Sequence, residues 1–117
     1  MKTNIMLDRA TAFSVRIVKL HDYLTTEKNE YTISKQIIRC GTSIGANISE
    51  ANYGQSRADF HSKLHIALKE CGETEYWLRV LSDSGYLSEK LFDSLLKDCL
   101  DLKYMLLASL NTSKKNE

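Results

Sequence analysis

The sequence predicts an all-α protein: one domain over residues 1–117, folded as an antiparallel up-down-up-down four-helix bundle. Three observations support this fold class. The chain has no proline, which favours long uninterrupted helices because proline breaks a helix interior. Apolar residues recur at the helical period in four successive segments. Only a few residues connect these segments, and such short connections favour antiparallel neighbours.

The first two helices are expected over about residues 5–26 and 33–53. At about 100° per residue, the apolar side chains of each segment fall within an arc of roughly 80°. They are Met6, Ala10, Phe13, Ile17, Leu20 and Leu24 in the first segment, and Ile33, Ile37, Cys40, Ile44, Ile48 and Ala51 in the second. Thr32 or Ser34 is expected to cap the second helix through its hydroxyl oxygen. Gly54 suits the left-handed residue that often ends a helix.

The third and fourth helices are expected over about residues 57–83 and 89–110. Their core positions are Phe60, Leu64, Ala67, Cys71 and Leu78 in the third, and Leu91, Leu95, Leu102 and Leu106 in the fourth. Ser56, with a carboxylate three residues later, is an N-cap signal, and Ser88 is expected to cap the fourth helix. Residues 111–117 contain no apolar side chain, so we expect this tail to fray.

Further apolar side chains lie outside the expected core stripes. They include Val18, Ile38, Ile66 and Trp77. Burial against other subunits explains second apolar strips on several helices better than exposure to water does. Trp77 is a large apolar anchor of the kind enriched at interfaces, and Glu73 suits an ion pair between helices or subunits. We therefore expect a homo-oligomer.

Positive charge is concentrated in the first part of the chain. The net charge is +1, yet residues 1–69 hold ten Lys and Arg against six Asp and Glu. Most of the positive charge on the first two helices comes from Arg9, Arg16, Lys19, Lys35 and Arg39. These side chains are candidates for contacts with nucleic-acid phosphates. The alternative is an ordinary solvated face.

No motif points to catalysis, a metal or a cofactor. Residues 41–45, Gly-Thr-Ser-Ile-Gly, fit the pattern of a hydrolase nucleophile turn, but they lie within a helical segment that no strand precedes. His61 and His65 are one helical turn apart, yet two ligands do not complete a metal site. The three cysteines form no CxxC pair, which fits a reducing cytoplasm. With no export signal and no apolar run long enough for a membrane span, we expect a cytoplasmic protein without a membrane partner.

The segment Ser43-Ile44-Gly45-Ala46-Asn47-Ile48-Ser49-Glu50-Ala51 resembles the SIGANIAEG motif of a bacterial four-helix-bundle family, the S23 or 23S rRNA intervening-sequence protein family. A later part of the chain looks like that family's second block. It comprises Ser56, Asp59-Phe60, Leu64, Ile66-Ala67, Glu70, Glu73-Thr74-Glu75-Tyr76-Trp77-Leu78 and Gly85-Tyr86-Leu87. The resemblance covers about residues 10–110.

This resemblance implies a four-helix protomer that assembles into a homopentameric ring, and it implies no catalytic residue. A related branch is the accessory variability protein of diversity-generating retroelements, a pentamer that associates with reverse transcriptase and nucleic acid through a basic surface. Within the motif, Ser43, Gly45 and Ala46 are small enough for a neighbouring helix to approach closely. Asn47 and Glu50 are expected to bond across helices or subunits.

We therefore expect a non-enzymatic, homo-oligomeric binding or scaffold protein. Its expected partners are further copies of itself and RNA, DNA or a nucleic-acid enzyme such as a reverse transcriptase, with no cofactor, metal or small-molecule substrate. One alternative is a purely structural oligomer that has a protein partner and binds no nucleic acid. Another is a metal-binding or enzymatic bundle.

Overall fold

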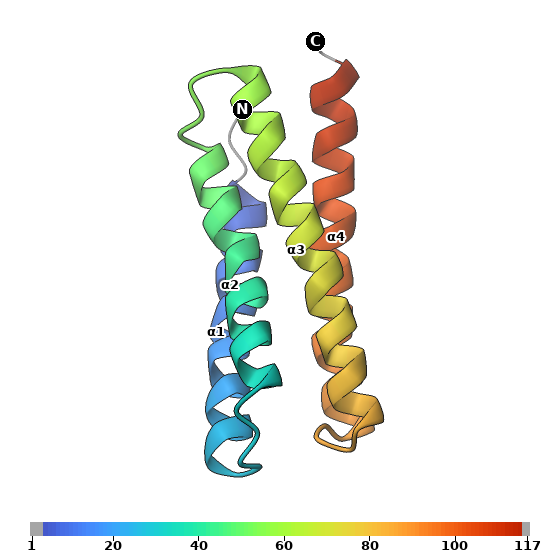
Figure 1. Cartoon of the computed structure of the whole chain (residues 1–117). Helices are drawn as coiled ribbons and strands as arrows, with labels where there is room; N and C mark the ends of the chain where they lie inside the picture. The colour runs from blue at the N-terminus through green and yellow to red at the C-terminus, as the bar shows by residue number, and fades with distance from the viewer. Residues whose placement is uncertain (1–3, 116–117) are drawn as a thin grey trace.

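The computed structural model describes the backbone of residues 4–115 and the side chains of residues 4–112. Four helices follow one another: α1 (Asn4–Thr26), α2 (Ile33–Ala51), α3 (Arg57–Asp83) and α4 (Glu89–Lys115). Residues 4–115 contain no strand, so the prediction of an all-α chain with four helices is confirmed. Figure 1 shows that the chain turns back at each connection, so that consecutive helices lie side by side.

Each helix packs against two others. α2 and α4 both lie between α1 and α3, whereas the diagonal pairs do not approach within 8 Å between Cα atoms anywhere in residues 4–115. The helices therefore occupy the corners of a square. The first and last helices, α1 and α4, which no loop connects, make the least mutual contact of the four neighbouring pairs.

The predicted apolar stripes form one core inside this square. All six expected side chains of α1 are buried, and fully buried residues such as Ile44, Leu64 and Leu106 meet them from the other helices. Each such side chain stabilises the fold by about 1.5–3 kcal/mol. Two expected core residues, Ile33 and Leu91, are only half-buried, because each lies in the first turn of its helix at an end of the bundle.

The N-terminus of α2 is capped by Glu30 and not by the hydroxyl of Thr32 or Ser34. Thr32 makes no side-chain cap bond. Instead, the Glu30 carboxylate accepts hydrogen bonds from the backbone N–H groups of Thr32, Ile33 and Ser34, at 3.2, 3.1 and 2.7 Å. Ser34 Oγ donates back to the Glu30 carbonyl at 2.8 Å. A carboxylate can satisfy three free N–H groups at once and is also favoured by the helix dipole.

The other helix ends agree with the sequence in part. Ser56 accepts from Asp59 N at 3.0 Å, and Ser88 accepts from Leu91 N at 3.1 Å, as predicted. Gly54 does not have the expected left-handed backbone, which occurs at Gly85 with φ 86°. A Cβ on Gly54 would lie 3.1 Å from Phe60 N, so the loop needs Gly54 for close packing.

Two helix bounds also differ from the prediction. α2 ends at Ala51, before the predicted residue 53. α4 continues to Lys115, so residues 111–115, which were expected to fray, are helical. Extension of an existing helix adds one backbone hydrogen bond per residue and needs no apolar side chain. Residues 116–117 lie outside the described part of the chain.

Candidate functional site

The fold brings the two motif blocks together on one outer surface, between α2 and α3. Arg39 pairs with Glu70 and Glu73 near one end of this surface, and Glu50 pairs with Lys63 nearer the other. Residues further along α2 thus face residues earlier in α3. We call this surface the α2–α3 face. It consists of Arg39, Ser43, Ala46, Asn47 and Glu50 from α2, and Ile66, Glu70, Glu73 and Trp77 from α3.

A charged network crosses this face. Arg39 Nη1 lies 3.3 Å from Glu70 Oε2, and Arg39 Nη2 donates to Glu73 Oε2. Trp77 Nε1 donates to the same Glu73 oxygen at 3.0 Å. The hydrogen bond from Arg39 lowers the pKa of Glu73, the Trp77 N–H lowers it further, and the pKa of Arg39 is raised in return. The network therefore holds the Trp77 indole in one orientation at the surface.

The motif residues of α2 agree with the expectations only in part. Ser43 Oγ and Asn47 Nδ2 donate to carbonyls of their own helix, at 2.6 and 2.8 Å, so Asn47 makes no bond to another helix within the described chain. Glu50 does reach α3, at 3.7 Å from Lys63 Nζ. Ala46 is exposed, so it gives no neighbouring helix of the protomer a closer approach.

Close approach of α1 and α2 depends instead on Gly41, one of the two glycines of α2 that face α1. A Cβ on Gly41 would lie 2.9 Å from Ile17 Cγ1, and a Cβ on Gly45 would lie 3.4 Å from Ala10 Cβ. The absence of a side chain at Gly41 lets α1 pack tightly on α2, whereas a Cβ on Gly45 would make an ordinary van der Waals contact. The interpretation of Gly45 as a packing residue therefore stays a prediction. Residues 41–45 lie in a helix, and residues 4–40 contain no strand before them.

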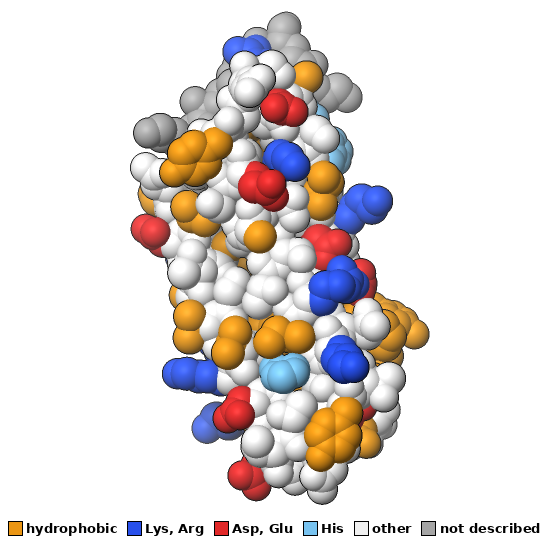
Figure 2. All heavy atoms as spheres, turned by 60° about the vertical axis from the view of Figure 1, so that its left-hand side comes forward, with side chains coloured by type: hydrophobic (Ala, Val, Ile, Leu, Met, Phe, Trp, Pro, Cys, Tyr) orange, Lys and Arg blue, Asp and Glu red, His pale blue; other side chains and the backbone are white. Residues whose placement is uncertain are grey.

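The predicted interface residues lie on two sides of the protomer. Ile66 is 38% exposed on the α2–α3 face, where Trp77 packs partly on the core. Val18 is 50% exposed on α1. Ile38 is half-buried on α2. Because Ile38 lies seven residues before Gly45, it is on the side of α2 that faces α1. Figure 2 looks onto the side formed by α1 and α2, where some hydrophobic side chains lie next to one another in a band beside a histidine and others stand apart.

The five predicted basic residues do not form one patch. Arg16 Nη1 binds Asp98 Oδ2 of α4 at 2.7 Å, whereas Arg39 binds carboxylates of α3. In the square arrangement these are opposite sides of the bundle. Arg9 lies two helical turns before Arg16, so it is on the same side of α1 as Arg16. Lys35 lies one turn before Arg39, so it is on the same side of α2 as Arg39. In Figure 2 the basic side chains are interspersed with acidic ones.

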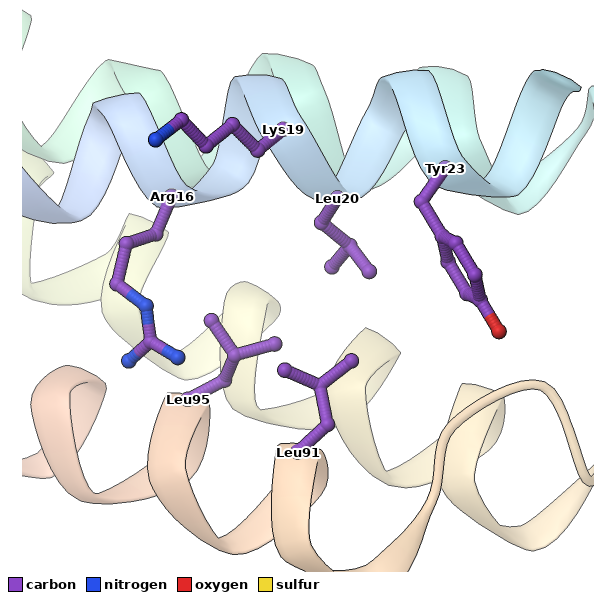
Figure 3. Close-up of a pocket in the computed structure, with 6 residues that line it drawn as sticks. All are labelled: Arg16, Lys19, Leu20, Tyr23, Leu91 and Leu95. Carbon is purple, nitrogen blue, oxygen red and sulfur yellow. The ribbon is translucent and has the colours of Figure 1, made fainter. Parts of the chain in front are cut away.

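A pocket that the sequence did not indicate opens between α1 and α4. Its volume is about 320 Å³, and it is lined by Arg16, Lys19, Leu20, Tyr23, Leu91 and Leu95 (Figure 3). Further along the same groove is a smaller pocket of about 90 Å³, with Arg9 and Asp98 in its lining. The only sequence signal was the alternation of basic and apolar residues around Leu20. That signal does not reveal which helix lies opposite.

The thiols and imidazoles offer little chemistry. Cys40, Cys71 and Cys99 are all buried. Burial is the main cause that raises the pKa of Cys40, and a hydrogen bond with Cys71 together with burial raises that of Cys99. Both thiols therefore stay protonated, which makes them poor nucleophiles. The rings of His61 and His65 lie 4.9 Å apart, but no described residues form a group of three or more metal-ligating side chains.

Comparisons with known proteins place the chain among related sequences. The family model for the 23S rRNA-intervening sequence protein matches residues 2–108. A crystal structure of a protein of unknown function from the S23 ribosomal protein family of Bacteroides thetaiotaomicron is similar, with 47% sequence identity and a TM-score of 0.92. The similarity covers 95% of this chain and 99% of that one. No curated protein matches. No helix within residues 4–115 is both long and apolar enough to cross a membrane.

Proposed function

The chain belongs to the 23S rRNA-intervening sequence protein family, and from this membership we propose that it is a non-enzymatic subunit of a homo-oligomeric scaffold. The α2–α3 face is the observation that carries this proposal. Ala46, Glu50 and Ile66 belong to the two motif blocks, yet core packing does not account for them because they are exposed. Surface motif residues beside an oriented tryptophan and arginine have the composition of a protein interface.

A ring of subunits requires two different contact surfaces on each copy, because a ring contact is heterologous. The α2–α3 face supplies one of them. The exposed Val18 and the half-buried Ile38, on the side formed by α1 and α2, supply the other. The family resemblance favours an up-and-down protomer and five copies. The three free cysteines favour a cytoplasmic location. The protonated, buried thiols support a role without nucleophilic catalysis.

Two matched substitutions test this assembly. Ile66 on the α2–α3 face and Leu107 on α4 are each 38% exposed, so Ile66→Asp and Leu107→Asp make equivalent changes at different surfaces. Light scattering of the unmodified protein at micromolar concentration should give a mass well above 13.4 kDa, near that of five protomers. Ile66→Asp should lower this mass, and Leu107→Asp should not. A monomeric parent protein, or equal effects of the two variants, would contradict the proposal.

Binding of RNA or DNA, alone or together with a reverse transcriptase, is a second candidate function. Arg9, Lys19 and Lys35 have no carboxylate at ion-pair distance among the described residues, so their charges are available to phosphates. Repetition of these charges in a ring would strengthen a weak contact through multivalency. Arg16 and Arg39 contribute less because carboxylates already bind them.

Retention on immobilised RNA and DNA at increasing salt tests this second function. The unmodified protein should elute at a defined salt concentration, and Arg9→Gln combined with Lys35→Gln should elute at lower salt. Lys97→Gln is a suitable control, because Lys97 already binds Asp101 at 2.9 Å. An oligomer without salt-dependent retention would favour the alternative, a structural oligomer with a protein partner.

A further inference from the structure

The larger pocket of the α1–α4 groove has the size of a ligand site. Its volume of about 320 Å³ lies at the lower end of the range of about 300–1,000 Å³ that small-molecule pockets occupy. It forms where the first and last helices, which no loop joins, make least contact. The groove reaches inward to the core, because Leu20 and Leu95 are only 4% and 1% exposed.

Three leucines give the pocket apolar walls. Figure 3 shows Leu20 extending from α1 toward α4, with Leu91 and Leu95 extending from α4 to meet it. Leu91 is the half-buried residue of the three. An apolar ligand body placed against these side chains would remove its own surface and the exposed part of Leu91 from water, because Leu20 and Leu95 are already almost fully buried. Removal of the ligand's apolar surface from water is the main favourable term in binding of this kind.

The charges at the pocket select an anionic ligand. Figure 3 shows Arg16 and Lys19 toward one end and Tyr23 at the other, and no carboxylate is among the lining residues. Asp98 already binds Arg16. Lys19 has no carboxylate at ion-pair distance among the described residues. The charge of Lys19 is thus not balanced by a carboxylate, which suits a ligand with a single negative charge.

We propose that this pocket binds an amphiphilic monocarboxylate of the medium-chain fatty-acid class. The carboxylate lies at Lys19, and the chain runs between Leu20, Leu91 and Leu95 toward Tyr23. This inference goes beyond the scaffold function and does not depend on it. The sequence led us to expect no small-molecule substrate, and the proposed ligand undergoes no reaction.

Leucine-methyl NMR of the full chain, titrated with decanoate below its micelle-forming concentration, tests the proposal. Saturable shifts are expected at Leu20, Leu91 and Leu95. Decanol, which has the same chain without the charge, should bind more weakly by up to about fivefold, the size expected of one exposed ion pair. Decyltrimethylammonium should bind more weakly still. Equal affinities for decanoate and decanol, or the absence of saturable shifts, would overturn the proposal.

Two lysine variants distinguish a specific contact between Lys19 and the carboxylate from a general attraction of the ligand to positive charge. Lys19→Gln should weaken decanoate binding by up to about fivefold and leave decanol binding unchanged. Lys35→Gln removes another exposed charge, on α2, and should change the binding of neither decanoate nor decanol. Equal effects of the two variants would refute the assignment of Lys19. Leu91→Trp, which fills the pocket, should abolish the shifts at Leu20 and Leu95, with circular dichroism confirming that the helices remain.

A lipid headgroup could supply the same anionic chemistry as a free acid. Cosedimentation with phosphatidylglycerol vesicles distinguishes the two sources. The pocket holds one short chain and not a bilayer surface, so we expect saturable decanoate binding without cosedimentation. Cosedimentation that requires Lys19, in a protein that gives no saturable shifts with decanoate, would overturn the proposal.

Discussion

Substitution of Gly41 by alanine tests how closely α1 and α2 are packed. The new Cβ would lie 2.9 Å from both Cγ1 and Cγ2 of Ile17, a separation that requires one of the groups to move. Ile17 is fully buried and branched at Cβ, so its side chain has few alternative rotamers. Gly72, which lies within α3, is a natural control because nothing lies within 4 Å of its added Cβ.

The two substitutions should have different effects on stability. Replacement of a mid-helix glycine by alanine gains about 1 kcal/mol of helix propensity, so Gly72→Ala should stabilise the protein by about that amount. At Gly41 the same gain is opposed by overpacking, which typically costs about 1–3 kcal/mol. Gly41→Ala should therefore be neutral or destabilising by up to about 2 kcal/mol. The difference between the variants is then about 1–3 kcal/mol.

Urea unfolding followed by circular dichroism measures this difference. Because the proposed association of subunits would make stability depend on protein concentration, both variants and the parent should be compared at several concentrations. An equal gain in stability for Gly41→Ala and Gly72→Ala would refute the claim that the absence of a side chain at Gly41 is needed for the contact with α1.

Three further changes should have measurable effects. Glu30→Ala removes the acceptor of three backbone N–H bonds and should cost about 1–2 kcal/mol in urea unfolding, with no loss contradicting its role as a cap. Ile44→Ala should cost about 2–5 kcal/mol through lost burial and a residual cavity, and equal stability would place Ile44 outside the core. Since Arg39 lowers the pKa of Glu73, the stabilising effect of the ionised carboxylate is present at neutral pH and is lost as the pH falls through the lowered folded-state pKa. Arg39→Gln should reduce this acid sensitivity, and identical pH profiles would refute the contribution of the pair.

Much of the fold follows from the spacing of apolar residues, because that spacing reports which side of a helix meets the others. It placed Phe13, Ile44 and Leu106 correctly in the core. It could not show that Ile33 and Leu91 lie at the ends of the bundle, where one neighbour is missing. The cap of α2 was missed for a different reason. Glu30 reaches it from the preceding loop, three residues before the helix begins.

The candidate site was harder to predict, because it depends on which helices are neighbours. Arg16 and Arg39 belong to consecutive helices, so the sequence suggests one basic surface. In the structure they turn toward different partners, α4 and α3. The pocket beside Tyr23 arises between the first and last helices, and their separation is set by packing rather than by the length of a loop.

The order in which the helices pack during folding also follows from the fact that no loop joins α1, the first helix, to α4, the last. The connections between consecutive helices are short, so those helix pairs close over little intervening chain. The contact of Arg16 with Asp98 instead joins residues 82 positions apart, and such distant contacts carry the greater loop-closure cost. We expect the α1–α4 seam to close last in folding and to open first in unfolding. Interactions added across it would therefore slow unfolding and leave the folding rate almost unchanged.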